Sequence, residues 1–251
     1  MACGAAVLSF AALVGVVGAG AAACAFGGGN GREEPPAAED GERAERLEMV
    51  ETQVAARGVR DPGVLSALRT VPRHRFVPSP EARFAYTDGP LPIGYDQTIS
   101  QPYIVALMTE LIRPSRAMKV HEIGTGSGYQ AAVLAECVGQ VFTIEILEPL
   151  GRRAESLLRD LGYRNVHVRV GDGYDGWPEE APFDAVLVTA APARIPQPLL
   201  DQLKTGGRLV LPLGEGTQDL VVVTKTDRGA VREVVTAVRF VPMTGKVRNA
   251  P

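Results

Sequence analysis

The chain is poor in the side chains on which several kinds of site depend. It holds only 3 cysteines and 3 histidines among 251 residues. Cys3 and Cys24 lie near the amino terminus, and His74, His121 and His167 are too scattered to share a ligand spacing. These shortages exclude a disulfide framework and a cysteine-rich zinc site, and no metal site is expected.

Positive charge is not in excess either. The 26 Lys and Arg residues stand against 29 Asp and Glu residues, which gives a formal net charge of -3. A nucleic-acid-binding surface needs a basic stripe or patch, so no nucleic-acid partner is expected. Hydrophobic residues make up 45% of the chain, which is enough for the core of one domain of ordinary size.

The amino-terminal part differs in composition from the rest. Residues 1–29 carry no charge, and their length suits a signal-peptide core or a weak membrane span. The end of this segment, Ala21–Cys24, resembles a lipoprotein cleavage site, although the positive flank is missing; translation starting near Met49 is the alternative. Residues 30–43 are predicted to be a disordered linker before a folded domain over 44–246, with a tail at 247–251. Membrane contact is expected only through residues 1–29.

Hydrophobic periodicity predicts helices first and then an alternation of strands and helices. Helices are expected at 47–58, at 64–71 and at 104–112, with a proline-rich loop between the last two. Further along, strands are expected at 117–123, 141–146, 166–170, 183–190, 207–213, 219–225 and 231–241, and helices at 128–138, 149–161 and 197–204. This alternation predicts an α/β fold with a doubly wound, mostly parallel sheet. A short turn at 227–229 makes the last strand pair antiparallel.

The strongest local signal is a glycine-rich run between an expected strand and an expected helix, Glu122-Ile123-Gly124-Thr125-Gly126-Ser127-Gly128. Glycines here let the backbone turn sharply and approach a ligand closely. A nicotinamide fingerprint would need glycine where Tyr129 stands, which argues against an oxidoreductase. The spacing of Gly124, Gly126 and Gly128 is instead that of class I methyltransferases. It predicts an S-adenosyl-L-methionine site that includes Ser127, with Glu122 near the amino-acid part of the cofactor.

Two acidic residues follow at the ends of later strands. Glu145 can accept hydrogen bonds from both ribose hydroxyls, although an ordinary exposed strand-end glutamate is the alternative. Asp172, followed by Gly173, suits a hydrogen bond to the adenine amino group, although a simple turn is the alternative. Both acids and the glycine run fall at carboxyl ends of strands, where this architecture binds ligands.

Several motifs together resemble protein-L-isoaspartate O-methyltransferases. They are Val71–Pro78, Asp96–Pro102, Val120–Ala135, Gly171–Pro192 and Arg239–Met243, and the resemblance covers roughly residues 46–246. It implies a Rossmann-like class I methyltransferase fold. It also implies transfer of a methyl group from S-adenosyl-L-methionine to the free carboxylate of L-isoaspartyl residues in damaged proteins and peptides, which initiates their repair. His121 departs from the family, which usually has an aliphatic residue at this position.

The resemblance also assigns the active-site role to Ser100. It implies that Thr98, Ile99 and Ser100 bind the substrate and that the Ser100 hydroxyl orients its carboxylate. From spacing alone, Ser100 would merely help to start the helix that has Pro102 in its first turn. The proline-rich region 72–102 is the expected wall of an open substrate groove.

Two other functions stay open from the sequence. A class I methyltransferase for another substrate is one, but Thr189–Pro192 occupies the place where amino-directed enzymes often carry Asn/Asp-Pro-Pro-Tyr. A non-catalytic, exported protein that binds S-adenosyl-L-methionine is the other, suggested by residues 1–29. A cytoplasmic location is expected because the cofactor is made in the cytoplasm, with an exported or lipid-anchored form as the alternative. The sequence does not indicate an oligomeric state, and a monomer is taken as the default.

Overall fold

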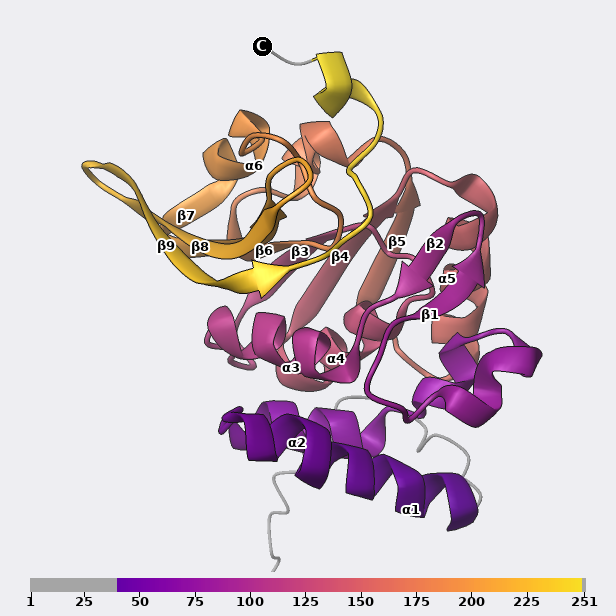
Figure 1. Ribbon diagram of the computed structural model, residues 1–251. Helices are drawn as coiled ribbons and strands as arrows, with labels where there is room; N and C mark the ends of the chain where they lie inside the picture. Colours follow the sequence, from indigo (N-terminus) through magenta and orange to yellow (C-terminus); the bar gives the residue numbers. More distant parts are fainter. Residues whose placement is uncertain (1–39, 250–251) are drawn as a thin grey trace, which may run out of the picture. The chain divides into compact units, whose positions relative to one another are not determined.

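The computed structural model of the protein describes residues 40–249 (Figure 1). The segment 1–29 and most of the predicted linker therefore lie outside the described residues. Helix α1, Asp40–Met49, begins within the segment predicted as linker, four residues before the expected start of the domain at residue 44. Among the described residues, no helix combines the length and the hydrophobicity that crossing a membrane requires.

A seven-stranded sheet in the order β5-β4-β3-β6-β7-β8-β9 forms the centre of the domain. The strands are β3 Lys119–Ile123, β4 Gln140–Glu145, β5 Val166–Val170, β6 Phe183–Val188, β7 Leu203–Leu213, β8 Gln218–Thr226 and β9 Gly229–Val238. The five strands from β5 to β7 pair in parallel, whereas β8 and β9 run antiparallel to their neighbours. The predicted fold class, including the antiparallel pair at the carboxyl terminus, is confirmed.

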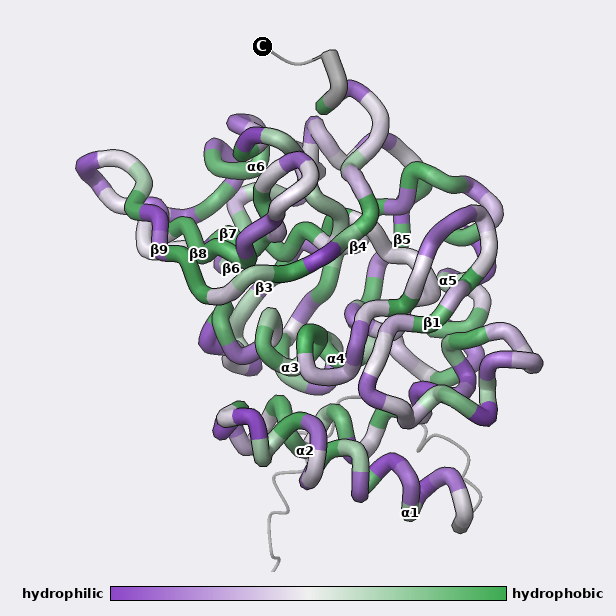
Figure 2. The backbone as a smooth tube through the Cα atoms, viewed as in Figure 1, coloured by the Kyte–Doolittle hydropathy of each residue, from purple (hydrophilic) through white to green (hydrophobic). Residues whose placement is uncertain are grey.

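Helices cover both faces of the sheet. Helices α3 (Pro102–Leu111), α4 (Tyr129–Cys137) and α5 (Glu148–Asp160) contribute to one hydrophobic core, whereas α6 (Gln197–Asp201) contributes to the other. Helix α2, Pro62–Thr70, packs on α3 and α4, as Figure 1 shows. Hydrophobic residues concentrate along the central strands, while α1 and the tip of the β8–β9 hairpin are hydrophilic (Figure 2).

The proline-rich region predicted as a loop contains a β-hairpin. Strands β1, Leu91–Gly94, and β2, Gln97–Ile99, pair antiparallel through a turn in which Tyr95 and Asp96 have φ values of 55° and 56°. Such turns normally carry Asn or Gly, so Tyr-Asp offers no hairpin signal in the sequence. Arg153 of α5 donates a 2.8 Å hydrogen bond to the backbone oxygen of Ile93, which ties the hairpin to the domain.

The helix predicted at 197–204 is wrong at its carboxyl end. Helix α6 stops at Asp201, because Leu203 already pairs with Phe183 at the start of β7. The ammonium group of Lys225 on β8 donates to the backbone oxygens of Leu200, Asp201 and Leu203, which satisfies the free carbonyls of the helix end. Pairing with β6 and hydrogen bonds from a distant strand therefore fix the end of the helix, and the local sequence pattern does not predict either contact.

His121 lies buried on β3, in the position where the family usually has an aliphatic residue. Its Nδ1 makes a 2.7 Å hydrogen bond with the backbone oxygen of Phe142, and its ring stacks on Phe183 with centroids 4.8 Å apart. Nε2 is buried and has no hydrogen-bond partner among residues 40–249. Burial disfavours the charged imidazolium and lowers the pKa of His121 to about 4.

This histidine should make the fold sensitive to acid. Because its pKa is lower in the folded chain than in the unfolded chain, the unfolded state binds the proton more tightly below about pH 6.5. Between pH 8 and pH 5, His121 should lower the free energy of unfolding by roughly 2 kcal/mol, and His121→Val should abolish this decrease. Urea unfolding at both pH values measures it, with the exposed His167→Val as the control. An unchanged pH dependence in His121→Val would contradict this account.

Candidate active site

The glycine-rich run forms a turn between β3 and α4 with three positive φ angles, which glycine adopts most readily. Gly124, Gly126 and Gly128 have φ values of 94°, 55° and 91°. A Cβ atom on Gly124 would lie 2.4 Å from the hydroxyl of Thr189, which donates to the backbone oxygen of Gly124. A Cβ atom on Gly128 would press against Leu158 of α5 at 3.2 Å. The first glycine thus allows close approach of β6, and the third allows close packing of α4 on α5.

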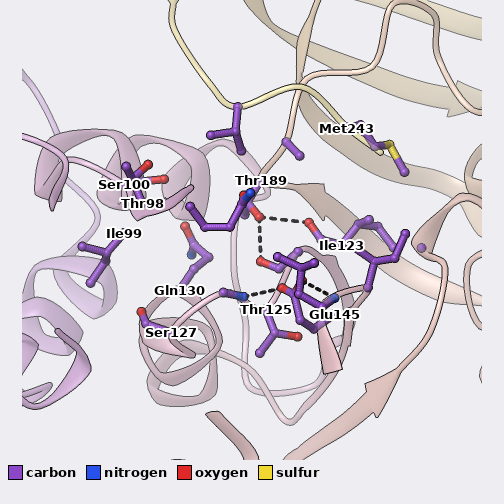
Figure 3. A pocket seen from close by; sticks show the side chains of 18 of the residues that line it. Thr98, Ile99, Ser100, Ile123, Thr125, Ser127, Gln130, Glu145, Thr189 and Met243 are labelled. Atoms are coloured by element: carbon purple, nitrogen blue, oxygen red, sulfur yellow. Dashed lines mark hydrogen bonds between the residues drawn. The ribbon is translucent and has the colours of Figure 1, made fainter. Parts of the chain in front are cut away.

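The carboxylate of Glu145 holds this turn from the neighbouring strand. Its two oxygens accept hydrogen bonds from the backbone nitrogens of Gly126, at 2.8 Å, and Leu147, at 2.9 Å. A carboxylate offers about four lone-pair positions, so each oxygen can still accept a bond from a ligand. Glu145 also lines a cavity beside the turn (Figure 3). It is not the ordinary exposed glutamate of the alternative interpretation, since its side chain is buried.

This cavity lies at the carboxyl ends of β3, β4 and β6 and brings most of the predicted site residues together. Those in its wall are Thr98, Ile99, Ser100, Gly124, Gly126, Ser127, Glu145 and Gly173. Figure 3 shows Thr98, Ile99 and Ser100 on one side and Thr125, Glu145 and Ile123 on the other. The hairpin that the sequence did not predict therefore supplies one wall of the cavity.

Asp172, Glu122 and Gly128 are not in the cavity wall. The carboxylate of Asp172 accepts hydrogen bonds from the backbone nitrogens of Tyr174, at 2.9 Å, and Lys246, at 2.7 Å. These bonds match the turn that was the alternative interpretation of Asp172. Its contact with adenine stays a prediction.

Glu122 alternates with Ile123 along β3, so its side chain points to the opposite face of the sheet from that of Ile123. It is completely buried, and within residues 40–249 neither carboxyl oxygen has a hydrogen-bond partner of good geometry, although the Thr143 side chain lies near enough to lower its pKa slightly. Burial, together with the nearby charge of Glu145, raises the pKa of Glu122 to about 8. The carboxyl group is therefore held mainly in its neutral form at pH 7, and its contact with a cofactor stays a prediction.

Glu122 should destabilise the fold increasingly as the pH rises through the neutral range. Since its pKa is raised in the folded chain, the folded state binds the proton more tightly, and stability falls as pH rises from about 4.5 toward 8. Glu122→Gln should raise stability at pH 8 by at least about 1 kcal/mol more than at pH 5. Urea unfolding measures both values, and the exposed Glu155→Gln serves as control. If Glu122→Gln changed the free energy of unfolding equally at the two pH values, the raised pKa of Glu122 would be refuted.

The hydroxyl of Ser100 is not used to start a helix. Helix α3 begins at Pro102, its cap position is Gln101, and no side chain caps it. Within residues 40–249, no hydrogen bond of the Ser100 hydroxyl is found, and Ser100 lines the cavity. It also lines an adjacent groove whose other wall is formed by residues 236–241. Ser100 thus stands where the cavity and the groove meet.

Several cavity residues were missed by the sequence analysis. Thr189 directly follows β6, and the rule that ligands bind at carboxyl ends of strands could have found it. Gln130, in the first turn of α4, carried no such signal. The segment 241–244 reaches the cavity from the far end of the sequence, because Ala191 exchanges 2.8 Å backbone hydrogen bonds with Val241 and Met243.

The doubly wound sheet with antiparallel strands at its carboxyl-terminal edge, together with a glycine turn in which Tyr129 replaces the last glycine of a nicotinamide fingerprint, is the arrangement of class I methyltransferases. The sequence model of the family described as protein-L-isoaspartate(D-aspartate) O-methyltransferase (PCMT) matches residues 44–248. A protein-L-isoaspartate O-methyltransferase of Gloeobacter violaceus is 59% identical over 198 residues, which cover 78% of this chain and 97% of that protein. The chain belongs to the protein-L-isoaspartate O-methyltransferase family.

Solved structures agree with this family. A protein-L-isoaspartate O-methyltransferase superposes with a TM-score of 0.74 at 30% identity, over 82% of this chain and 67% of that one. A beta-aspartate methyltransferase from Plasmodium falciparum, solved in complex with S-adenosyl-L-homocysteine, superposes with a TM-score of 0.69 at 25% identity. The match covers 79% of this chain and 98% of that chain.

Proposed function

We propose that this chain transfers a methyl group from S-adenosyl-L-methionine to the free carboxylate of L-isoaspartyl residues in damaged proteins and peptides. The observation that carries the proposal is the position of Ser100, at the junction of the cavity and the groove. A cofactor in the cavity and a peptide in the groove would meet at this hydroxyl. Family membership supports both the reaction and its cofactor.

The residues of the cavity fit the proposed cofactor. Glu145 retains acceptor positions for ribose hydroxyls after its two backbone hydrogen bonds are made. A Cβ atom on Gly173 would lie 2.4 Å from Ile123, so the glycine allows β3 and the loop after β5 to approach closely beside the cavity. When bound, the cofactor supplies a methyl group on a positively charged sulfur, which is the electrophile of the reaction.

The chain needs no strong base for this reaction. An isoaspartyl carboxylate is ionised at neutral pH and is already a nucleophile. The protein has to align the carboxylate oxygen with the methyl group and to keep water away. In the proposed mechanism the Ser100 hydroxyl donates a hydrogen bond to one carboxylate oxygen and leaves the other free to react. Buried Met243, in the segment 241–244 that lines the cavity, contributes to excluding water.

The groove suits recognition of the polypeptide backbone. One wall, which includes Ser100, belongs to the region 72–102 that was expected to line it, while the other, residues 236–241, was not foreseen. Arg57 at its margin is held by an ion pair with Asp88, at 3.3 Å, and lies 3.7 Å from the centre of the Tyr103 ring. Among the strands that the structure describes, β9 forms an edge of the sheet, and its outer backbone groups there have no sheet partner and could pair with an extended peptide.

We further propose that the enzyme acts as a monomer in the cytoplasm, where its cofactor is made. An exported or lipid-anchored form through residues 1–29 is the alternative. Mass spectrometry of the native amino terminus separates the two, because a mature chain that begins at a lipidated Cys24 would overturn the cytoplasmic assignment.

The reaction can be tested with two peptides that differ only in one linkage. The full chain is incubated with methyl-labelled S-adenosyl-L-methionine and a peptide containing either isoaspartate or normal aspartate. Base-labile label on the isoaspartyl peptide alone is expected, because a methyl ester of the free carboxylate is labile. Labelling of neither peptide by a chain that binds the cofactor would overturn the proposed substrate.

The role of Ser100 predicts a separation between turnover and cofactor binding. Ser100→Ala should lower kcat by about tenfold or more, since a charge-assisted hydrogen bond is lost, while the Kd for S-adenosyl-L-homocysteine stays the same. Initial rates and calorimetry measure the two quantities. Ser66→Ala, on the exposed side of α2, should change neither. If Ser100→Ala lowered kcat and the affinity for S-adenosyl-L-homocysteine by similar factors, Ser100 would not be the residue that orients the substrate carboxylate.

A further inference from the structure

Gln130 presents a fixed amide group to the cavity. The side chain comes from the first turn of α4, is 8% exposed and lines the cavity. Its Nε2 donates a 2.9 Å hydrogen bond to the hydroxyl of Thr109 on α3. That hydroxyl in turn donates a 2.7 Å hydrogen bond to the backbone oxygen of Val105. Both Thr109 bonds are buried, so water does not compete for them.

This chain of hydrogen bonds determines which way the amide faces. A hydroxyl has one proton, and the proton of Thr109 is used on Val105. Thr109 can therefore only accept from Gln130, which requires the amide nitrogen on its side. In the flipped orientation Thr109 would donate to Gln130 instead, and its bond to Val105 would be lost. The carbonyl oxygen of Gln130 is thus left as an acceptor on the cavity side.

The position of Gln130 indicates which part of the cofactor it meets. Glu145 and Gly173 line the cavity on the β4 and β5 side of the glycine turn. Under the proposed function, this is the end that receives the adenosine part of the cofactor. Gln130 follows the turn, and Figure 3 shows it between Ser100 and the group formed by Thr125 and Glu145. The amino-acid end of the cofactor, which leads away from the adenosine, carries an ammonium group that needs acceptors in a buried site.

We propose that the Gln130 carbonyl oxygen binds the ammonium group of S-adenosyl-L-methionine, and that Thr109 is the positioning residue that sets the amide orientation. The inference rests on the proposed function, because it takes this cofactor as the ligand. An amide suits the place because it attracts an ammonium group without adding another buried carboxylate beside Glu145 and Glu122. The Gln130 amide does not take part in binding the adenosine part of the cofactor under this proposal.

The test compares three ligands by calorimetry. S-Adenosyl-L-homocysteine has the complete amino-acid end, its desamino analogue lacks only the ammonium group, and 5′-methylthioadenosine lacks the whole end. Gln130→Leu should raise the Kd of S-adenosyl-L-homocysteine by about tenfold or more, since a hydrogen bond to a charged group is lost. The same substitution should leave the Kd of the other two ligands within about twofold. Gln130→Met is a second variant of similar volume, in case Leu disturbs the packing of α4.

Thr109→Val tests the positioning role. This substitution removes the hydroxyl that accepts from the Gln130 amide and allows the amide to flip. The Kd of S-adenosyl-L-homocysteine should then rise by a smaller factor, about threefold, while the Kd of the desamino analogue stays unchanged. Equal weakening of all three ligands in either Gln130 variant would overturn the inference, because it would indicate a general disturbance of the cavity. An unchanged Kd for S-adenosyl-L-homocysteine, combined with a raised KM for the peptide, would also overturn it and place Gln130 on the substrate.

These outcomes are separate from failure of the proposed function. Binding is measured without a methyl acceptor, so the inference can hold even if isoaspartyl peptides are not methylated. If the unchanged chain binds none of the three ligands, the proposed cofactor itself is wrong, and the inference fails with it.

Discussion

The site depends on one constraint, which is that the backbone between β3 and α4 is held in a turn with three positive φ angles. Two neighbouring strands hold it from opposite sides. Glu145 at the end of β4 accepts from the nitrogen of Gly126, and Thr189 after β6 donates to the oxygen of Gly124. Because β3 lies between β4 and β6 in the sheet, the strand order itself brings these two side chains to the turn. The strand order of the sheet therefore determines the geometry of the site.

Polar groups around this turn divide into those that face the cavity and those buried behind it. Glu145 faces the cavity and is already oriented by two backbone donors, so it needs little rearrangement to accept a ligand. Glu122 is completely buried on β3 just before the turn, and burial raises its pKa to about 8, so its carboxyl group is mainly neutral at pH 7. Gln130 adds an uncharged acceptor at the end of the cavity proposed for the amino-acid part of the cofactor. This distribution limits the number of buried charges that the fold must tolerate.

Local pattern was enough to predict the sheet, the glycine turn and Glu145, because each follows from periodicity or from glycine at the end of a strand. Recognition of Thr98–Ser100 needed the family resemblance, since the hairpin that carries them is too short and has an unusual turn. The orientation of Asp172 toward Lys246, the end of α6 at Lys225 and the crossing of residues 241–244 over the cavity arise from contacts between distant parts of the chain. A single sequence carries no local signal for these contacts.

The affinity of Glu145→Gln for S-adenosyl-L-homocysteine, measured by calorimetry, tests the central claim that Glu145 both holds the turn and receives the cofactor. The amide keeps the size of the side chain but replaces an acceptor oxygen with a donor, which faces either a backbone N–H group or a ribose hydroxyl. The account predicts a Kd raised by about tenfold or more. Glu148→Gln, on the exposed start of α5, should leave the Kd unchanged. An unaltered Kd in a folded Glu145→Gln chain would contradict the claim.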